Sequence, residues 1–209
     1  MKITWIGHSC FKIEKDGHII VLDPYEDGSV PGYAPVREEA DLVLCSHGHR
    51  DHNAKERVTL RETSETPYEI TKIETFHDDA RGTQRGLNTI HIISDGETRI
   101  AHFGDLGCKL EAEQIEMLKG LDVALIPVGG FFTIDAAQAA ELVAEINPRI
   151  VIPMHYSNAG QGLGYDVIGP VEKFTELMPD VMTVPAYEID SSMKLSSQVV
   201  VLQAQNCGK

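Results

Sequence analysis

Residues 46–53 constrain this chain most strongly, because they place four potential metal ligands directly after an apolar run. The octet reads Ser-His-Gly-His-Arg-Asp-His-Asn and follows Leu-Val-Leu-Cys at residues 42–45. Imidazole nitrogens and carboxylate oxygens are the ligands that zinc and similar divalent ions prefer. Packing does not explain so many polar groups, because an aspartate is almost never buried without a partner. We therefore interpret the octet as half of a metal site rather than a polar loop. Its candidate ligands are His47, His49, Asp51 and His52.

The pattern of apolar runs predicts an α/β fold. Short runs rich in Ile, Val and Phe dominate the first half of the chain and predict strands. Their ranges are 2–6, 10–14, 18–23, 41–46, 69–74, 88–94 and 98–103. After residue 106, the expected helices are 111–118, 136–146 and 171–177, and the expected strands are 123–127, 149–153, 181–184 and 199–203. Two mixed sheets with helices on their outer faces would bury the apolar side of each element.

Length and charge narrow the classes of function. The chain has 209 residues, which suffices for a single domain spanning 1–209, and no low-complexity linker divides it. Its net charge of −14 disfavours long nucleic acids, because binding to phosphates depends on clustered Lys and Arg. No apolar run approaches the roughly 20 residues that cross a bilayer. The N-terminus lacks the pattern of a signal peptide. We therefore expect a cytoplasmic protein that does not contact a membrane.

Three further ligand-type residues follow expected strands at distant points of the sequence. They are His77, Asp105 and His155. A rigid sheet can hold groups on such loops close together. We therefore expect these three residues to complete the site that the octet begins.

The number of ligands fits two ions. A catalytic zinc ion takes about three protein ligands and keeps a position open for water. Two ions that share a water molecule would form a hydrolytic centre. The first set would be His47, His49 and His77. The second set would be Asp51, His52 and His155, with Asp105 as the bridge between the two ions.

With these residues in view, the chain resembles a known family. Residues 47–52 match the HxHxDH signature of the metallo-β-lactamase superfamily. The rest resembles its small bacterial metal-dependent hydrolases, the branch that contains L-ascorbate-6-phosphate lactonase. The segments that carry this resemblance are 4–9, 21–24, 102–105, 126–130 and 152–156. The resemblance implies an αβ/βα four-layer sandwich, a site for one or two metal ions, and the same two ligand sets with the same bridging aspartate.

Three other residues are expected near the metal ions. A metal-bound histidine usually donates its free N–H to a carboxylate or carbonyl group, so we expect Asp23 to orient a ligand rather than only to cap a turn. His8 lies between two expected strands, where it supports the site, faces the substrate or holds the hairpin through hydrogen bonds. Tyr156, next to His155, could donate a hydrogen bond to the substrate or to a developing oxyanion.

Several loop residues have open roles. Asp78 and Asp79 replace the usual surroundings of His77 in the family and could be ligands, supporting groups or solvated side chains. The loop 129–133 either lets a substrate approach its glycines or forms an ordinary turn with core aromatic residues. The Gly-rich segment 158–165 is either a lid or a solvent loop. A phosphate group on the substrate would need a cation, and the candidates are Arg50, Arg81 and Arg85.

The predicted chemistry is hydrolysis of a small-molecule ester, lactone or phosphodiester by metal-activated water. Zinc is the expected metal, with manganese, iron or nickel as alternatives. The residues assigned to catalysis are Asp105, Asp51 and His155. Asp105 or another carboxylate at the metal would pass a proton to the leaving group, so no serine or cysteine nucleophile is needed.

Other functions remain open at this point. The chain could be a non-catalytic metal-binding or sensing protein of the same fold, or a phosphodiesterase or nuclease. An iron redox role is disfavoured, because such proteins usually carry a flavodoxin-like domain and this chain ends soon after its last expected strand. We expect a small molecule as partner, neither a long nucleic acid nor a membrane, and a homo-oligomer is compatible with the sequence.

Overall fold

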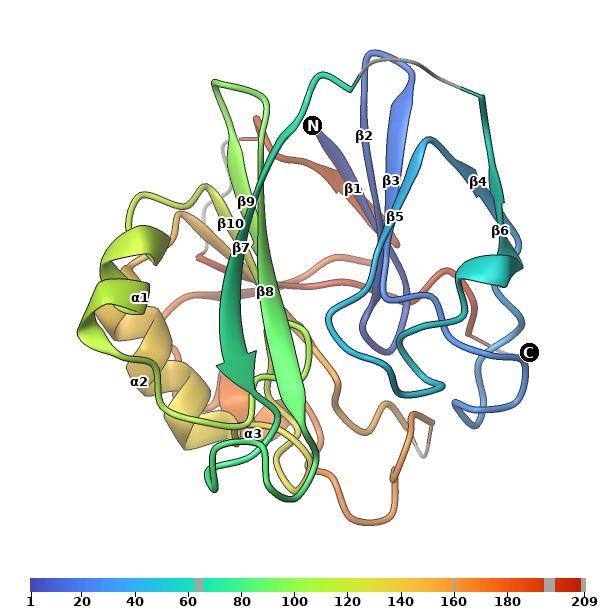
Figure 1. Cartoon of the computed structure of the whole chain (residues 1–209). Coiled ribbons are helices and arrows are strands. Elements are labelled where there is room, and N and C mark those ends of the chain that lie inside the picture. The colour runs from blue at the N-terminus through green and yellow to red at the C-terminus, as the bar shows by residue number, and fades with distance from the viewer. Residues whose placement is uncertain (63–65, 160, 194–197, 208–209) are drawn as a thin grey trace.

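A computed structural model describes residues 1–62, 66–159, 161–193 and 198–207 of the chain. Two mixed β-sheets form the body of the molecule, and helices lie on the outer side of one of them (Figure 1). This confirms the predicted α/β class with two mixed sheets. The expected domain range of 1–209 stays a prediction.

The five-stranded sheet has the order β13-β1-β2-β3-β5. Its strands are β1 (Lys2–Gly7), β2 (Cys10–Lys15), β3 (His18–Leu22), β5 (Leu42–Leu44) and β13 (Glu188–Asp190). Neighbouring strands are antiparallel except β3 and β5, which are parallel. The parallel pairing matters for the site, because it brings the end of β3 beside the start of the histidine-rich octet. Asp23 N–H donates to Leu44 O at that point (3.0 Å).

The seven-stranded sheet has the order β12-β14-β11-β10-β9-β8-β7. Its strands are β7 (Glu69–Phe76), β8 (Leu87–Ser94), β9 (Arg99–His102), β10 (Val123–Pro127), β11 (Ile150–Met154), β12 (Val181–Thr183) and β14 (Val199–Val201). The pairs β7–β8 and β8–β9 are antiparallel, and the remaining pairs are parallel. Every residue of β10 and β11 is buried, which is typical of parallel strands covered on both faces.

Helices α1 (Ala112–Leu118) and α2 (Ala136–Ile146) lie beside the seven-stranded sheet, on the side away from the five-stranded sheet (Figure 1). Helix α2 begins with a capping box, in which Asp135 accepts from Gln138 N–H and the Gln138 side chain accepts from Asp135 N–H. It ends at Asn147, whose left-handed backbone stops the helix. The sequence predicts these two helices to within one residue.

Helix α3 (Glu172–Thr175) is shorter than the predicted range of 171–177. The chain on either side of it forms tighter turns, in which Phe174 N–H donates to Val171 O and Leu177 N–H donates to Phe174 O, three residues apart. Its one buried side chain is Phe174. In the described part of the chain, no helix is both long and apolar enough to cross a membrane.

Three short strands are absent from the sequence prediction. β4 (Glu38–Ala40) and β6 (Val58–Leu60) form a two-stranded sheet, with the 3-10 helix η1 (Lys55–Arg57) directly before β6. The third is β13, which pairs with β1. Strands of three residues carry almost no periodic signal, so their pairing depends on partners that are distant in sequence.

The predicted ligands all follow the C-terminal ends of strands. His77 directly follows β7, His155 directly follows β11, Asp105 follows β9, and the octet follows β5. The two sheets meet at the octet, because Thr89 N–H in β8 donates to Ser46 O (2.9 Å). The fold therefore gathers ligands from both sheets in one place.

Candidate metal centre

Asp105 lies at the centre of the histidines. Its Oδ2 atom is 3.2 Å from His52 Nε2 and 3.3 Å from both His77 Nε2 and His155 Nε2. His47 Nε2 lies farther away, at 3.9 Å. One carboxylate oxygen thus faces both predicted ligand sets, as a bridge between two ions would.

Asn88 holds the backbone of Asp105 in place. Its Oδ1 accepts from Asp105 N–H (2.9 Å), and its Nδ2 donates to Thr75 Oγ1 (2.8 Å) and Phe103 O (3.0 Å). Asn88 is completely buried. Sequence reasoning missed this residue, because a lone asparagine at the start of a strand gives no signal of its partners.

The first cluster consists of His47, His49 and His77. His47 Nε2 lies 3.1 Å from His49 Nδ1, and the rings of His47 and His77 have their centroids 4.7 Å apart. His49 is exposed, whereas His77 is buried. The predicted first ligand set is therefore brought together at the surface end of the site.

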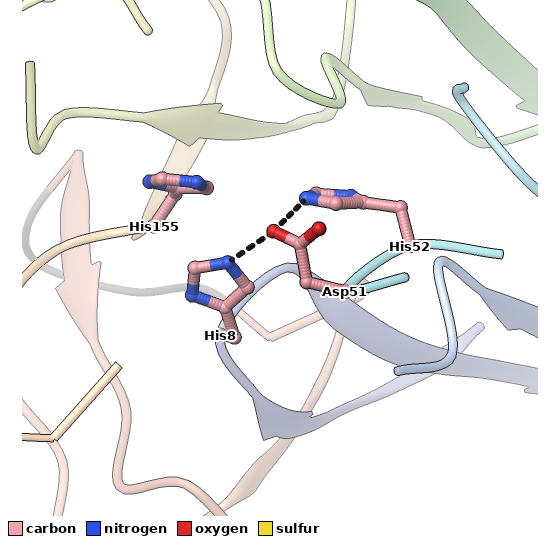
Figure 2. A group of neighbouring side chains, drawn as sticks. All are labelled: His8, Asp51, His52 and His155. Carbon is pink, nitrogen blue, oxygen red and sulfur yellow. Dashed lines mark ion pairs between the residues drawn. The ribbon is translucent and has the colours of Figure 1, made fainter. Parts of the chain in front are cut away.

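The second cluster consists of His8, Asp51, His52 and His155 (Figure 2). Asp51 Oδ2 lies between two histidines, 3.2 Å from His52 Nε2 and 3.5 Å from His8 Nε2. His155 lies across from them, with its ring centroid 4.2 Å from that of His8. All four residues are buried. The predicted second ligand set is thus assembled, and His8 stands within it.

The charges of the two clusters suit a metal ion. Burial and the neighbouring His52 lower the pKa of His47 to about 3, and burial with His155 lowers that of His8 to about 4. Burial opposes ionisation of Asp105, but His155 and His52 hold its pKa well below the usual range. Burial opposes protonation of His52, but the carboxylates of Asp105, Asp51 and Asp23 raise its pKa well above the usual value. Neutral imidazoles and ionised carboxylates are the forms that bind metals, so a bound ion would displace the proton of His52.

Several buried ligand atoms have no hydrogen-bond partner within the described residues. They include both ring nitrogens of His155, His52 Nε2 and Asp105 Oδ1. An unpartnered buried polar atom costs about 1–3 kcal/mol. A divalent metal ion would bind nitrogen and oxygen atoms that converge in this way. The residues present therefore fit the metal ion that the sequence predicts.

Asp23 orients His52 from behind. Its Oδ2 accepts from His52 Nδ1 (2.7 Å) and from Ser46 Oγ (2.6 Å), and its Oδ1 accepts from Ser46 N–H (2.7 Å). Burial would raise the pKa of this carboxyl, but the nearby His102 and His52 hold it at about 2. The bond to Nδ1 fixes the tautomer of His52 and leaves Nε2 facing Asp51 and Asp105.

Three residues of this site have a strained backbone. His8, Asp23 and His155 have φ of 54°, 44° and 52°, a left-handed conformation that costs energy for residues other than glycine. Gly129 permits the turn at His155, because a Cβ on residue 129 would collide with the His155 carbonyl oxygen. This glycine therefore faces protein backbone, which answers the open question of what it approaches.

Tyr156 and His102 lie outside the two clusters. Tyr156 packs its ring against Trp5 (centroids 5.5 Å apart) and lines a separate pocket of about 570 Å³. His102 Nε2–H donates to the Ser9 carbonyl oxygen (2.8 Å), and His102 is not part of either cluster. The structure does not bring Tyr156 to the pocket beside the metal clusters.

Asp78 and Asp79 have different surroundings. Asp78 is buried, and its carboxylate accepts four backbone N–H groups from the following loop, at Ala80, Gly82, Gln84 and Arg85. Asp79 is exposed. Asp78 thus shapes the loop that carries Arg85.

A pocket of about 430 Å³ opens beside the clusters. His49 and His77 of the first cluster line it, together with Asp51 and Asp105. Its other walls include Arg50, Arg85, Phe132 and Leu163. Leu163 belongs to the Gly-rich segment 158–165, in which residue 160 lies outside the described residues, and the choice between a lid and a solvent loop stays open.

Comparison with known proteins identifies the family. The model of the beta-lactamase superfamily domain matches residues 2–155, which include every residue of both clusters. The chain belongs to the metallo-β-lactamase superfamily. This confirms the resemblance at the level of the superfamily.

Individual proteins that are similar to this chain support the same assignment. A UPF0173 metal-dependent hydrolase from Thermoplasma acidophilum is 31% identical over 189 residues, which cover 75% of this chain and 84% of that protein. Another from Methanopyrus kandleri is 29% identical over 193 residues, with 75% and 84% covered. The crystal structure of a candidate zinc-dependent hydrolase of the superfamily from Thermotoga maritima matches with a TM-score of 0.75 and 32% identity, over 96% of this chain and 97% of that one. The chain thus belongs to a family of metal-dependent hydrolases.

Proposed function

We propose that this protein is a zinc-dependent hydrolase of small anionic molecules that contain an ester, lactone or phosphodiester bond. One observation carries the proposal: two ligand clusters joined at Asp105 Oδ2 border a pocket that also presents Arg50 and Arg85. The clusters would hold the metal ions that activate water, and the two arginines would bind a negatively charged group of the substrate.

The metal ions would be held by the two clusters and by Asp105. When bound, two divalent ions supply an activated water molecule and positive charge for the oxyanion that develops on the substrate. Zinc suits the donor set of imidazoles and carboxylates. The name of the Thermotoga maritima protein supports zinc for this chain as well.

Carboxylates at the same place can move the proton. Asp105 Oδ1 makes no hydrogen bond within the described residues, and Asp105 lines the pocket. We assign this atom to take a proton from water and return it to the leaving group, as a general acid–base group does. Asp51, which also lines the pocket, is the second carboxylate within reach.

The two arginines favour an anionic substrate. Neither Arg50 nor Arg85 forms an ion pair with a carboxylate among the described residues, although the chain carries a net charge of −14. The guanidinium of Arg85 instead lies 5.8 Å from the centre of the Phe132 ring. Arginine binds carboxylate and phosphate groups through paired N–H donors. A free anion on the substrate would fill this role.

The size and charge of the surroundings favour a small molecule over a polymer. A pocket of about 430 Å³ lies within the range of small-ligand sites. The acidic balance of the whole chain repels long polyanions, whereas two local arginines suffice for one carboxylate or phosphate.

Matched substrates test the proposal. The assay compares para-nitrophenyl hexanoate with the mono-para-nitrophenyl ester of adipic acid, which adds one carboxylate, and with bis-para-nitrophenyl phosphate. Zinc-loaded protein should hydrolyse the charged ester more efficiently than the neutral one. Turnover of none of the three substrates at full zinc occupancy would favour a metal-binding role without catalysis.

A pair of variants locates the anion site. Arg85→Met should lower kcat/KM for the charged ester roughly 10–100-fold, the loss of one charged hydrogen bond, and leave the neutral ester unchanged. Arg81→Met is the matched control, because Arg81 is exposed on the same loop and does not line the pocket. Equal losses on both esters would contradict the role of Arg85 in anion binding.

A further inference from the structure

His8 is the buried residue of this centre that the predicted ligand sets leave out. Only 1% of its surface is exposed, and neither ring nitrogen has a hydrogen-bond partner within the described residues. A histidine that merely supported the hairpin would donate or accept through its ring. His8 instead turns its ring toward His155 and toward Asp51, whose Oδ2 lies 3.5 Å from His8 Nε2 (Figure 2).

The backbone holds His8 in this position. Its carbonyl oxygen accepts from the Trp5 indole N–H (2.9 Å) and from His155 N–H (3.5 Å). The register of β1 against β2 shifts between Trp5 and Gly7, just before His8 adopts its left-handed conformation. Strain of this kind persists where the surrounding structure fixes it, and it is concentrated at functional sites.

The spacing of the atoms matches shared coordination. Ligand atoms that bind one zinc ion tetrahedrally at about 2.0–2.1 Å lie about 3.3 Å from one another. His8 Nε2 is 3.5 Å from Asp51 Oδ2, which is 3.2 Å from His52 Nε2. His155 belongs to the same group, in which all candidate ligand atoms lie within 4.8 Å of one another.

We propose that His8 is a direct ligand of the second metal ion, together with Asp51, His52 and His155. This inference rests on the proposed function, which requires metal binding, and it adds the His8 side chain to the ligands of the second ion. His8, His52 and His155 do not line the pocket, whereas His49 and His77 of the first cluster do. The second ion would therefore be enclosed by protein and would exchange slowly, and the first ion would exchange quickly.

Metal binding tests this without reference to activity. Zinc affinity of the metal-stripped protein is measured by competition with a chromophoric chelator, and removal of bound zinc by excess chelator is followed in time. Wild type should bind two equivalents and release them in a fast and a slow phase. His8→Gln should weaken one equivalent at least about tenfold, as loss of a ligand group does, and abolish the slow phase.

Glutamine separates a ligand from an orienting residue. Its side chain can still donate a hydrogen bond to Asp51, so a role limited to that bond would survive in His8→Gln with the affinity of both equivalents unchanged, and the inference would be wrong. His18→Gln, in β3, is the control and should match wild type. A wild type that binds no zinc would instead overturn the proposed function.

A direct measurement on wild type does not depend on whether the variant folds. In cobalt-loaded protein, each imidazole bound to the metal gives a strongly shifted N–H resonance, and the crystal structure of zinc-loaded protein gives the bond itself. His8 Nε2 should lie about 2.0–2.1 Å from the second ion. An ion in the second cluster with His8 Nε2 beyond bonding distance would rule the ligand role out.

Discussion

The substitution Asp23→Asn removes one negative charge and tests how the Asp23 carboxylate supports zinc binding. Asp23 accepts three hydrogen bonds, from Ser46 N–H, Ser46 Oγ and His52 Nδ1. An asparagine offers one oxygen and one NH₂ group in their place. If NH₂ faces His52, then His52 must carry its proton on Nε2, the atom that faces the metal. If NH₂ faces Ser46 N–H, two donors oppose each other. Either orientation impairs the site.

The size of the effect follows from these contacts. A buried hydrogen bond to a charged group contributes about 1.5–3 kcal/mol. Loss of a carboxylate behind a metal-bound histidine typically lowers metal affinity about 10–100-fold, which corresponds to about 1.4–2.8 kcal/mol. We therefore expect Asp23→Asn to weaken zinc binding at the second cluster by one to two orders of magnitude.

The assay is a zinc titration of metal-stripped protein in competition with a chromophoric chelator, with urea unfolding measured in parallel. Asp95→Asn is the matched control. The Asp95 side chain is only 2% exposed and pairs with Lys15 at 2.6 Å, but it lies outside both ligand clusters. That variant should lose stability and keep its zinc affinity. An Asp23→Asn protein that is folded and binds both equivalents within threefold of wild type would refute the tautomer argument.

Three further predictions concern the surroundings of the site. Burial lowers the pKa of His91 to about 4, so the unfolded chain takes up a proton first as the pH falls below the ordinary value near 6.5. His91 then costs up to about 3 kcal/mol of stability between pH 6.5 and 4, in addition to the losses from His8 and His47. In urea unfolding at pH 7 and pH 4.5, His91→Gln should make the fall in stability smaller by about this amount, and an equal fall in both proteins would contradict the role of His91. Asp78→Ala should loosen the loop beside the pocket and raise KM for a charged ester several-fold. Asp79→Ala should leave KM unchanged, since Asp79 is exposed. Equal KM values for the two variants would contradict the role of the loop. Gly129→Ala should displace the turn at His155, because its Cβ would collide with that carbonyl oxygen, and should cost one equivalent of zinc; two equivalents of unchanged affinity would show that the turn tolerates the methyl group.

The sequence predicts those elements whose signal is local. Helix α2 is bounded by Asp135 and Asn147, so both of its ends can be read directly from the chain. Strands β10 and β11 are continuous apolar runs, and the octet stands at the end of β5. Strand β13, by contrast, has only three residues, and it forms by antiparallel pairing with β1, which is distant in sequence.

The same distinction holds for the site. The octet and the ligand-type residues at strand ends can be found from residue type and position alone. The place of His8 within the second cluster cannot, because it depends on how the turn after β1 is held against His155. Arg85 reaches the pocket through a loop that Asp78 organises. Asn88 accepts one hydrogen bond from Asp105 N–H and is itself held by Thr75 and Phe103. Each of these roles requires contacts between segments far apart in the sequence.

The most direct test of the account is a zinc titration of metal-stripped wild-type protein while hydrolysis of the charged para-nitrophenyl ester is recorded. Two clusters joined at Asp105 predict that the rate rises with added zinc and levels off at two equivalents per chain. Saturation at two equivalents without hydrolysis would contradict the catalytic role, and saturation at a single equivalent would contradict the two-ion centre.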